Sequence, residues 1–157
     1  MAGFLAESII EKIYQAAELY HRLILIAGPP GSGKTGVLRE IHRRIGAPLF
    51  NLNLELSGRM LDLTERQRTL RVPNLLLEIV GKPDKDMVLL DNIELIFDVS
   101  LKQDPLRLLQ GLSRNQTVVA AWGGAVSGDY LCYATADHPE YRRYPVQDLI
   151  VIEGSCE

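Results

Sequence analysis

The chain has 157 residues, of which 46% are hydrophobic and 24% charged, and its formal net charge is −3 at pH 7. This composition is that of an ordinary globular protein, and the length suits one domain, residues 1–157, whose core needs no disulfide or metal. No apolar run approaches the ~20 residues that span a bilayer, no signal peptide is evident, and the charge balance gives no argument for direct DNA binding. We therefore expect a cytoplasmic protein that does not contact a membrane.

The first predicted element is an amphipathic helix over residues 2–20, where Ile9 and Ile13 recur at helical spacing. We treat residues 1–21 as an N-terminal helix that packs on a core formed by residues 22–153. Packing of such a helix against the core is the simplest reading of its apolar face.

An apolar strand over residues 23–27 is followed by a glycine-rich turn and by a predicted helix over residues 33–45. The turn fits the pattern G-x-x-x-x-G-K-[ST], which requires this strand–turn–helix setting. Glycine lets backbone N–H groups converge on a phosphate, and the helix N-terminus adds partial positive charge. The predicted phosphate-binding residues are Gly28, Pro29, Pro30, Gly31, Ser32, Gly33, Lys34, Thr35 and Gly36.

A metal-binding pair is predicted from the same motif and from a second strand. Residues 87–90 are an unbroken apolar run that ends in Asp91, as in a buried parallel strand. Lys34 is expected to reach the β- and γ-phosphates, while the Thr35 hydroxyl and the Asp91 carboxylate hold Mg²⁺. The expected cofactors are therefore ATP and Mg²⁺, and adenine is favoured because no Asn/Thr-Lys-x-Asp guanine signature is present.

Between these motifs, alternating leucines predict a strand over residues 48–54. A capping-box pattern predicts a helix over residues 64–71, and Pro73 is expected to separate it from a second helix over residues 75–80.

The remaining elements continue the alternation of strands and helices. Asp104 is a predicted N-cap, residues 117–122 a buried strand, and residues 130–134 an antiparallel addition. Residues 138–144 are expected to form a loop or one helical turn, and residues 149–153 the last strand. The predicted fold is a three-layer α/β/α sandwich with a mostly parallel sheet and no C-terminal helical lid.

Hydrolysis needs a group that orients water. In the additional-strand branch of P-loop proteins (AAA+ and its relatives), which this chain resembles, a glutamate usually follows the strand-end aspartate directly, but here Asn92 has that position and Glu94 follows two residues later. We predict a catalytic role for Glu94 and Asn92. Arg142 and Arg143 are predicted to reach the nucleotide of an adjacent subunit, with Arg114 as the alternative.

The strand between the two motif strands is expected to carry a polar γ-phosphate sensor in that branch. Its tip, Ala121-Trp122-Gly123, has none. A divergent member is therefore indicated.

A narrower resemblance rests on several stretches together. The chain is similar to the small P-loop protein of type 3 BREX (bacteriophage exclusion) systems in the stretches 51–56, 91–94, 104–106, 121–122 and 138–142. This resemblance implies a bacterial cytoplasmic component of a phage-defence complex, beside a methyltransferase and a larger ATPase. Its partners would be other defence proteins, and DNA would be contacted only indirectly.

Three functions are compatible with these residues. The leading hypothesis is an ATP-binding, ATP-hydrolysing module that controls assembly with itself, as a homo-oligomer, or with partners. The second is a small-molecule or nucleotide kinase, since residues 28–34 also suit that class and the arginines within residues 59–71 offer an acceptor-phosphate site. The third is a switch that binds ATP without hydrolysing it.

Overall fold

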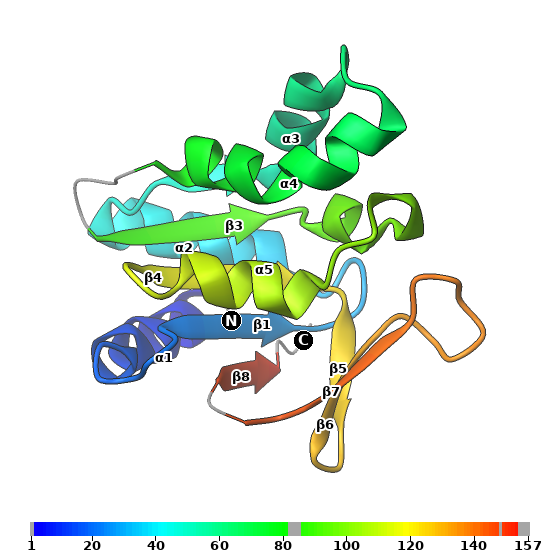
Figure 1. The fold of residues 1–157 in the computed structure, drawn as a ribbon. Helices are drawn as coiled ribbons and strands as arrows, with labels where there is room; N and C mark the ends of the chain where they lie inside the picture. Colours follow the sequence, from blue (N-terminus) through cyan, green and yellow to red (C-terminus); the bar gives the residue numbers. More distant parts are fainter. Residues whose placement is uncertain (1, 82–85, 148, 154–157) are drawn as a thin grey trace.

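The computed structural model describes residues 2–81, 86–147 and 149–153, and its centre is a five-stranded parallel sheet (Figure 1). The strand order is β2-β3-β4-β1-β8, and every neighbouring pair is parallel. The strands are β1 (Leu23–Ala27), β2 (Leu49–Asn51), β3 (Met87–Asp91), β4 (Thr117–Trp122) and β8 (Ile150–Glu153). β4 therefore lies between the two motif strands, β1 and β3.

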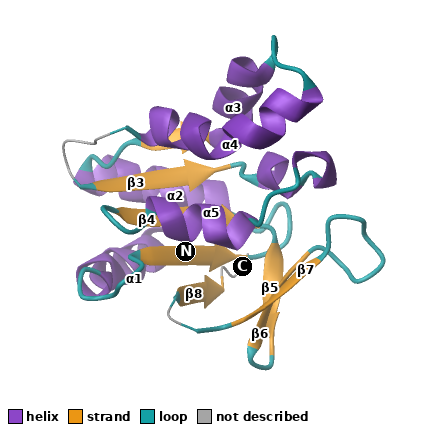
Figure 2. Ribbon diagram, in the orientation of Figure 1, coloured by secondary structure: helices purple, strands orange, loops and turns teal. Residues whose placement is uncertain are grey.

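Helices cover both faces of this sheet, with α5 in front of it and α2 behind it in Figure 2. The helices are α1 (Ala2–Ala16), α2 (Lys34–Ile45), α3 (Leu52–Met60), α4 (Glu65–Val80) and α5 (Pro105–Leu112). Along β1, Ile24 and Ile26 pack with α1 and α2, whereas Leu25 packs with α3, α4 and α5. This alternation, which is the strand period of two, builds the predicted three-layer α/β/α sandwich.

A second, antiparallel sheet follows β4 directly and projects from the sandwich (Figure 1). It consists of β5 (Gly124–Ser127), β6 (Tyr130–Tyr133) and β7 (Arg142–Pro145). The predicted antiparallel strand thus exists, but it belongs to a sheet of its own. The prediction that residues 138–144 form only a loop or turn is wrong from Arg142 onward. Gly124 permits the pairing, because a Cβ there would lie 1.8 Å from the Cys132 carbonyl oxygen.

The predicted strand over residues 48–54 is too long, since β2 ends at Asn51 and α3 begins at Leu52. The Asn51 side chain caps this helix by accepting a hydrogen bond from the Leu54 N–H at 3.1 Å. Leu52, Leu56 and Met60 are buried at a spacing of four residues. The alternating leucines are typical of a strand, but the residues that are buried in the structure follow a helical period.

The predicted break at Pro73 is also wrong, because α4 continues through it from Glu65 to Val80. Proline removes the N–H that would have bonded the Thr69 carbonyl. The Gln103 amide donates to that carbonyl at 2.8 Å instead. The predicted capping box is confirmed at Thr64 and Gln67.

The N-terminal helix is confirmed but ends at Ala16 rather than at residue 20. No helix among the described residues has the length and apolar character needed to cross a membrane.

Candidate functional site

The phosphate loop connects the carboxyl end of β1 to the N-terminus of α2, as the motif predicts. Gly31 and Gly33 have φ angles of +81° and +90°, a left-handed conformation that glycine adopts without a Cβ clash. No side chain caps α2, so its first N–H groups face the loop. The Gly28 N–H donates to the Trp122 carbonyl at 3.1 Å, which fixes the loop against β4. This arrangement is suited to holding an anion.

Lys34 curls over the loop. Its ammonium donates to the carbonyl of Gly28, to the carbonyl of Pro29 at 2.8 Å and to the Ser32 hydroxyl at 3.3 Å. Burial lowers the pKa of Lys34, while the charges of Glu94 and Asp91 oppose that shift. The lysine is thus close enough to both carboxylates to interact with them electrostatically.

Thr35 and Asp91 meet as predicted. The Thr35 hydroxyl donates to Asp91 Oδ2 at 2.7 Å, and the Asn92 N–H donates to Asp91 Oδ1 at 2.9 Å. Asp91 is only 8% exposed. These hard oxygen atoms fit Mg²⁺, which prefers one or two protein ligands completed by phosphate oxygens and water. The described residues contain no cluster of three or more His, Cys, Asp or Glu that could hold a metal.

Glu94 begins a short 3₁₀ helix, η1 (Glu94–Phe97), immediately after the β3 tip. Asn92 makes the turn between them with a φ angle of +51°. From α3, the Asn53 amide donates to Glu94 Oε1 at 3.3 Å, and its oxygen accepts the Leu95 N–H at 2.8 Å. Asn53 was missed as a site residue because the sequence placed it in a strand.

A cavity of about 770 Å³ joins these groups. The phosphate loop, the tips of β3 and β4, the end of β6 and the segment that follows it form its walls. The end of β6 and the following segment contribute four residues that were not predicted as site residues: Tyr133, Ala134, His138 and Glu140. A second pocket of about 540 Å³ adjoins it, because Asn92, Glu94 and Glu140 line both.

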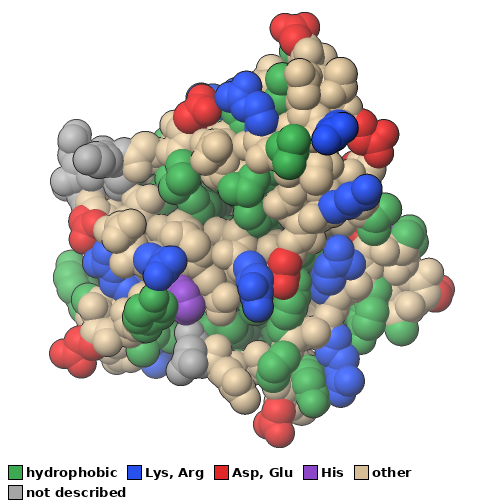
Figure 3. Space-filling model, in the orientation of Figure 1, with side chains coloured by type: hydrophobic (Ala, Val, Ile, Leu, Met, Phe, Trp, Pro, Cys, Tyr) green, Lys and Arg blue, Asp and Glu red, His purple; other side chains and the backbone are tan. Residues whose placement is uncertain are grey.

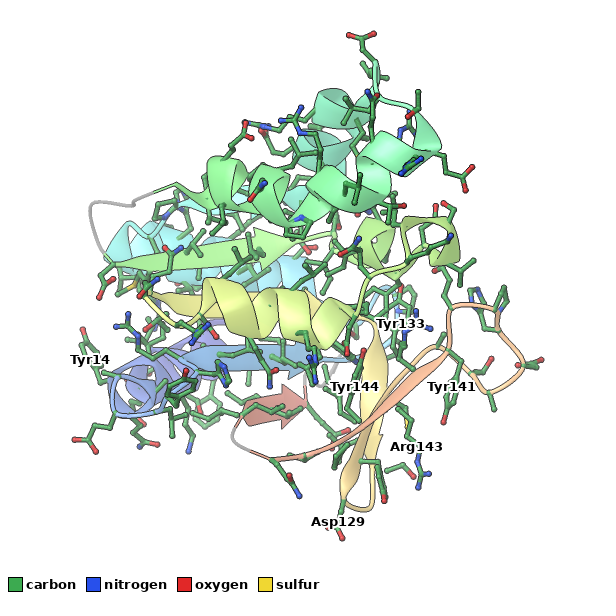
Figure 4. The ribbon with its side chains drawn as sticks, viewed as in Figure 1. Tyr14, Asp129, Tyr133, Tyr141, Arg143 and Tyr144 are labelled. Atoms are coloured by element: carbon green, nitrogen blue, oxygen red, sulfur yellow. The ribbon has the colours of Figure 1, made fainter. Side chains whose placement is uncertain are left out.

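The predicted arginines lie elsewhere. Arg142 and Arg143 are in β7 and do not line the cavity. The Arg143 guanidinium lies 3.6 Å from the centre of the Tyr130 ring, and Figure 4 shows Arg143 on the antiparallel sheet. Arg114 precedes β4, at the amino ends of the strands, and donates to the Tyr20 hydroxyl at 2.7 Å. None of the three serves the phosphate loop of its own chain.

The model of the family described as "ATPase family associated with various cellular activities (AAA)" matches residues 24–121, well over half of the chain. The chain belongs to the AAA family. The matched part of this AAA domain runs from β1 to β4, so it includes the phosphate loop, Asp91 and Glu94 but not the antiparallel sheet. Family membership implies a nucleotide-binding ATPase domain, usually with Mg²⁺.

Two further comparisons do not bear on the assignment of the chain to the AAA family. No curated protein matches the chain. Among solved structures, PCH-2 of C. elegans matches with a TM-score of 0.40 and 16% sequence identity, over 97% of this chain and 40% of that chain. The AAA domain thus spans less than half the length of that protein. Neither comparison bears on the BREX resemblance, which stays a prediction.

Proposed function

We propose that this AAA domain binds ATP with Mg²⁺ in the 770 Å³ cavity and hydrolyses it, with Glu94 orienting the attacking water. The observation that carries the proposal is the 2.7 Å contact between the Thr35 hydroxyl and the Asp91 carboxylate beside the phosphate loop. Thr35 lies in the first turn of α2 and Asp91 at the end of β3, so two distant parts of the chain supply the oxygen ligands that would hold Mg²⁺.

Each part of the loop has a separate task. The N–H groups of the loop and of the first turn of α2 bind the β- and γ-phosphate oxygens. Lys34 adds a positive charge from the half-buried position that it already occupies over the loop. Thr35 and Asp91 would hold Mg²⁺, which would neutralise charge on the phosphates.

Glu94 is the best-placed base in this cavity. Its carboxylate lines the same wall as Asp91 and is close enough to influence the pKa of Lys34. Because the chain turns at Asn92, the acid is at position 94 and not directly after Asp91. Asn53, in α3, then holds the Glu94 carboxylate by a hydrogen bond. A fixed carboxylate can accept the proton that water loses as it attacks the terminal phosphate.

Turnover of labelled ATP tests this proposal. Lys34→Ala is expected to abolish both ATP binding and phosphate release. Glu94→Gln should keep ATP binding and lose on the order of 10²–10⁴-fold in turnover, the usual contribution of a positioned base. Glu78→Gln, on the exposed side of α4, is the matched control and should change neither. Unchanged turnover in Glu94→Gln would remove Glu94 from the mechanism.

A switch that binds ATP without hydrolysing it is the second candidate. The supporting observation is that Asn92 holds the position directly after Asp91, while Glu94 is exposed at the start of η1. In the same assay, ATP binding without release of phosphate favours this candidate. Transfer of phosphate to an added acceptor would instead favour a kinase.

We extend the proposal to a role in a bacterial phage-defence complex in the cytoplasm, where the nucleotide state controls assembly with other defence proteins. Support comes from the sequence stretches that resemble type 3 BREX proteins, and residues of four of them (51–56, 91–94, 121–122 and 138–142) line one or other of the two adjoining pockets. Basic side chains are mixed with acidic and apolar ones on the face shown in Figure 3, which favours indirect DNA contact. Phage plating on cells that carry Lys34→Ala in the native operon tests this role, and unchanged protection would contradict it.

A further inference from the structure

The tip of β4 offers no polar side chain to the cavity, but the antiparallel sheet does. Ala121 and Gly123 line the cavity from β4. Tyr133, the last residue of β6, lies next to them and also lines the cavity. A Cβ placed on Gly123 would lie 3.3 Å from a carbon of the Tyr133 ring. A phenol hydroxyl thus reaches the wall that the β4 tip leaves apolar.

Tyr133 is held rigidly. Its ring stacks on Phe97 of η1 at a centroid distance of 3.5 Å and an angle of 10°, and it meets Trp122 edge-to-face at 5.9 Å. Both neighbours are fully buried, and Tyr133 itself is 6% exposed. The ring therefore connects the segment that carries Glu94, the β4 tip and the antiparallel sheet, and its hydroxyl has little freedom to move elsewhere.

The hydroxyl lacks a protein partner. No hydrogen bond is made by Tyr133 Oη among the described residues, where Gln116 Oε1 is the one buried polar side-chain atom without a partner, so the Tyr133 hydroxyl is open to the cavity. Tyr144, in the same sheet, differs from it, since its hydroxyl donates to Asp104 at 2.8 Å. A hydroxyl that has no protein partner, on a ring held at the wall of the cavity, is free to bond a ligand there.

We propose that the Tyr133 hydroxyl donates a hydrogen bond to the terminal phosphate of bound ATP. This inference rests on the proposed function and adds to it a contact from outside the part of the chain that matches the family. Through this contact the antiparallel sheet distinguishes a nucleoside triphosphate from a diphosphate, because the diphosphate has no group at that position.

The electrostatics keep this hydroxyl a donor. Burial raises the pKa of Tyr133, and the carboxylates of Glu94 and Glu140 raise it further. A phenol whose pKa is raised in this way stays protonated at neutral pH and can donate a hydrogen bond.

Calorimetric titration of wild type and Tyr133→Phe with ADP and with a non-hydrolysable ATP analogue tests the contact. The substitution keeps the stacked ring and removes only the oxygen. We expect affinity for the analogue to fall roughly tenfold or more, since hydrogen bonds to charged groups are among the stronger ones, while affinity for ADP is unchanged. Tyr144→Phe, whose hydroxyl bonds Asp104, is the matched control and should leave both affinities unchanged.

The other outcomes are distinct. If wild type binds both nucleotides and Tyr133→Phe binds them equally well, the contact does not exist while the proposed function stands. If turnover falls but neither affinity changes, the hydroxyl acts on Glu94 and the contact is refuted. If wild type binds no nucleotide, the proposed function itself fails. Should Tyr133→Phe misfold, the ring signal of Tyr133 in tyrosine-labelled wild type must shift with the analogue and not with ADP; equal shifts would refute the contact.

Discussion

At the scale of single residues, the central feature is the carboxylate of Asp91. This residue is 8% exposed, and its carboxylate accepts hydrogen bonds from the Thr35 hydroxyl and the Asn92 N–H. A buried charge is costly unless an opposite charge balances it. Lys34 is near enough for Asp91 to raise its pKa, but the lysine ammonium is bonded to loop carbonyls. A divalent cation bound by Thr35 and Asp91 would balance this charge best.

Asp91→Asn tests that balance. We expect affinity for ATP in the presence of Mg²⁺ to fall roughly tenfold or more, because a charge-assisted ligand is lost. Affinity for ATP with the metal chelated should stay equal or rise, since a negative charge near the phosphates is removed. Asp98→Asn, which lines only the adjoining pocket, is the control for calorimetry. Equal losses with and without Mg²⁺ would contradict the assignment of Asp91 as a metal ligand.

Asn53 is a second single residue with a testable effect, because its side chain holds the Glu94 carboxylate. Its amide bonds the Glu94 carboxylate and its oxygen bonds the Leu95 N–H, so Asn53→Ala frees the start of η1. We expect unchanged ATP affinity, a changed turnover rate and a loss of about 1–2 kcal/mol in the free energy of unfolding. Asn53→Asp separates the effects, because it keeps the acceptor for Leu95 but repels Glu94. If turnover is the same in wild type and both variants, Asn53 is only structural.

At the scale of elements, the sequence predicts the helices and strands that are marked by a pattern in their own or adjoining residues. Apolar runs predict β1, β3 and β4, and the phosphate loop predicts α2, which follows it. The phosphate loop and Asp91 followed, because parallel strands end at one edge of the sheet.

Elements that depend on distant partners could not be predicted in this way. The continuity of α4 through Pro73 needs Gln103, which lies 34 residues from the carbonyl that it bonds. Asn53 reaches the adjoining pocket from the start of α3, and Tyr133 and His138 reach the cavity from the end of β6 and the segment after it. Neither element has a local pattern that separates it from a plain strand or loop.

The proline in α4 gives a test of this distant compensation. Gln103→Ala leaves the Thr69 carbonyl without its donor, and we expect it to cost about 1–2 kcal/mol in denaturant unfolding. Pro73→Ala restores an N–H to α4, so the same change should cost less in that background. A double-mutant cycle with coupling near zero would show that Gln103 does not compensate for Pro73.

At the scale of the whole molecule, the predicted arginines lie where one chain cannot use them. Arg142 and Arg143 belong to β7, in the sheet that projects from the sandwich, and neither lines the cavity of its own chain. Arg143 is exposed, with its guanidinium over the Tyr130 ring. We therefore predict that, in an assembled ATPase, these arginines act on the nucleotide of a neighbouring subunit.

Mixing two inactive variants tests action between subunits. Lys34→Ala cannot bind ATP but keeps both arginines, whereas a variant with Arg142→Ala and Arg143→Ala keeps its phosphate loop. Each alone should show little turnover, with a loss on the order of 10³-fold or more for the arginine variant. The mixture should regain activity, because the first supplies arginines to the cavity of the second. Arg107→Ala, an 85%-exposed arginine on α5, should be fully active alone. A mixture as inactive as its parts, with light scattering showing only monomers in the presence of ATP, would mean that the arginines of β7 are surface residues and that each domain acts by itself.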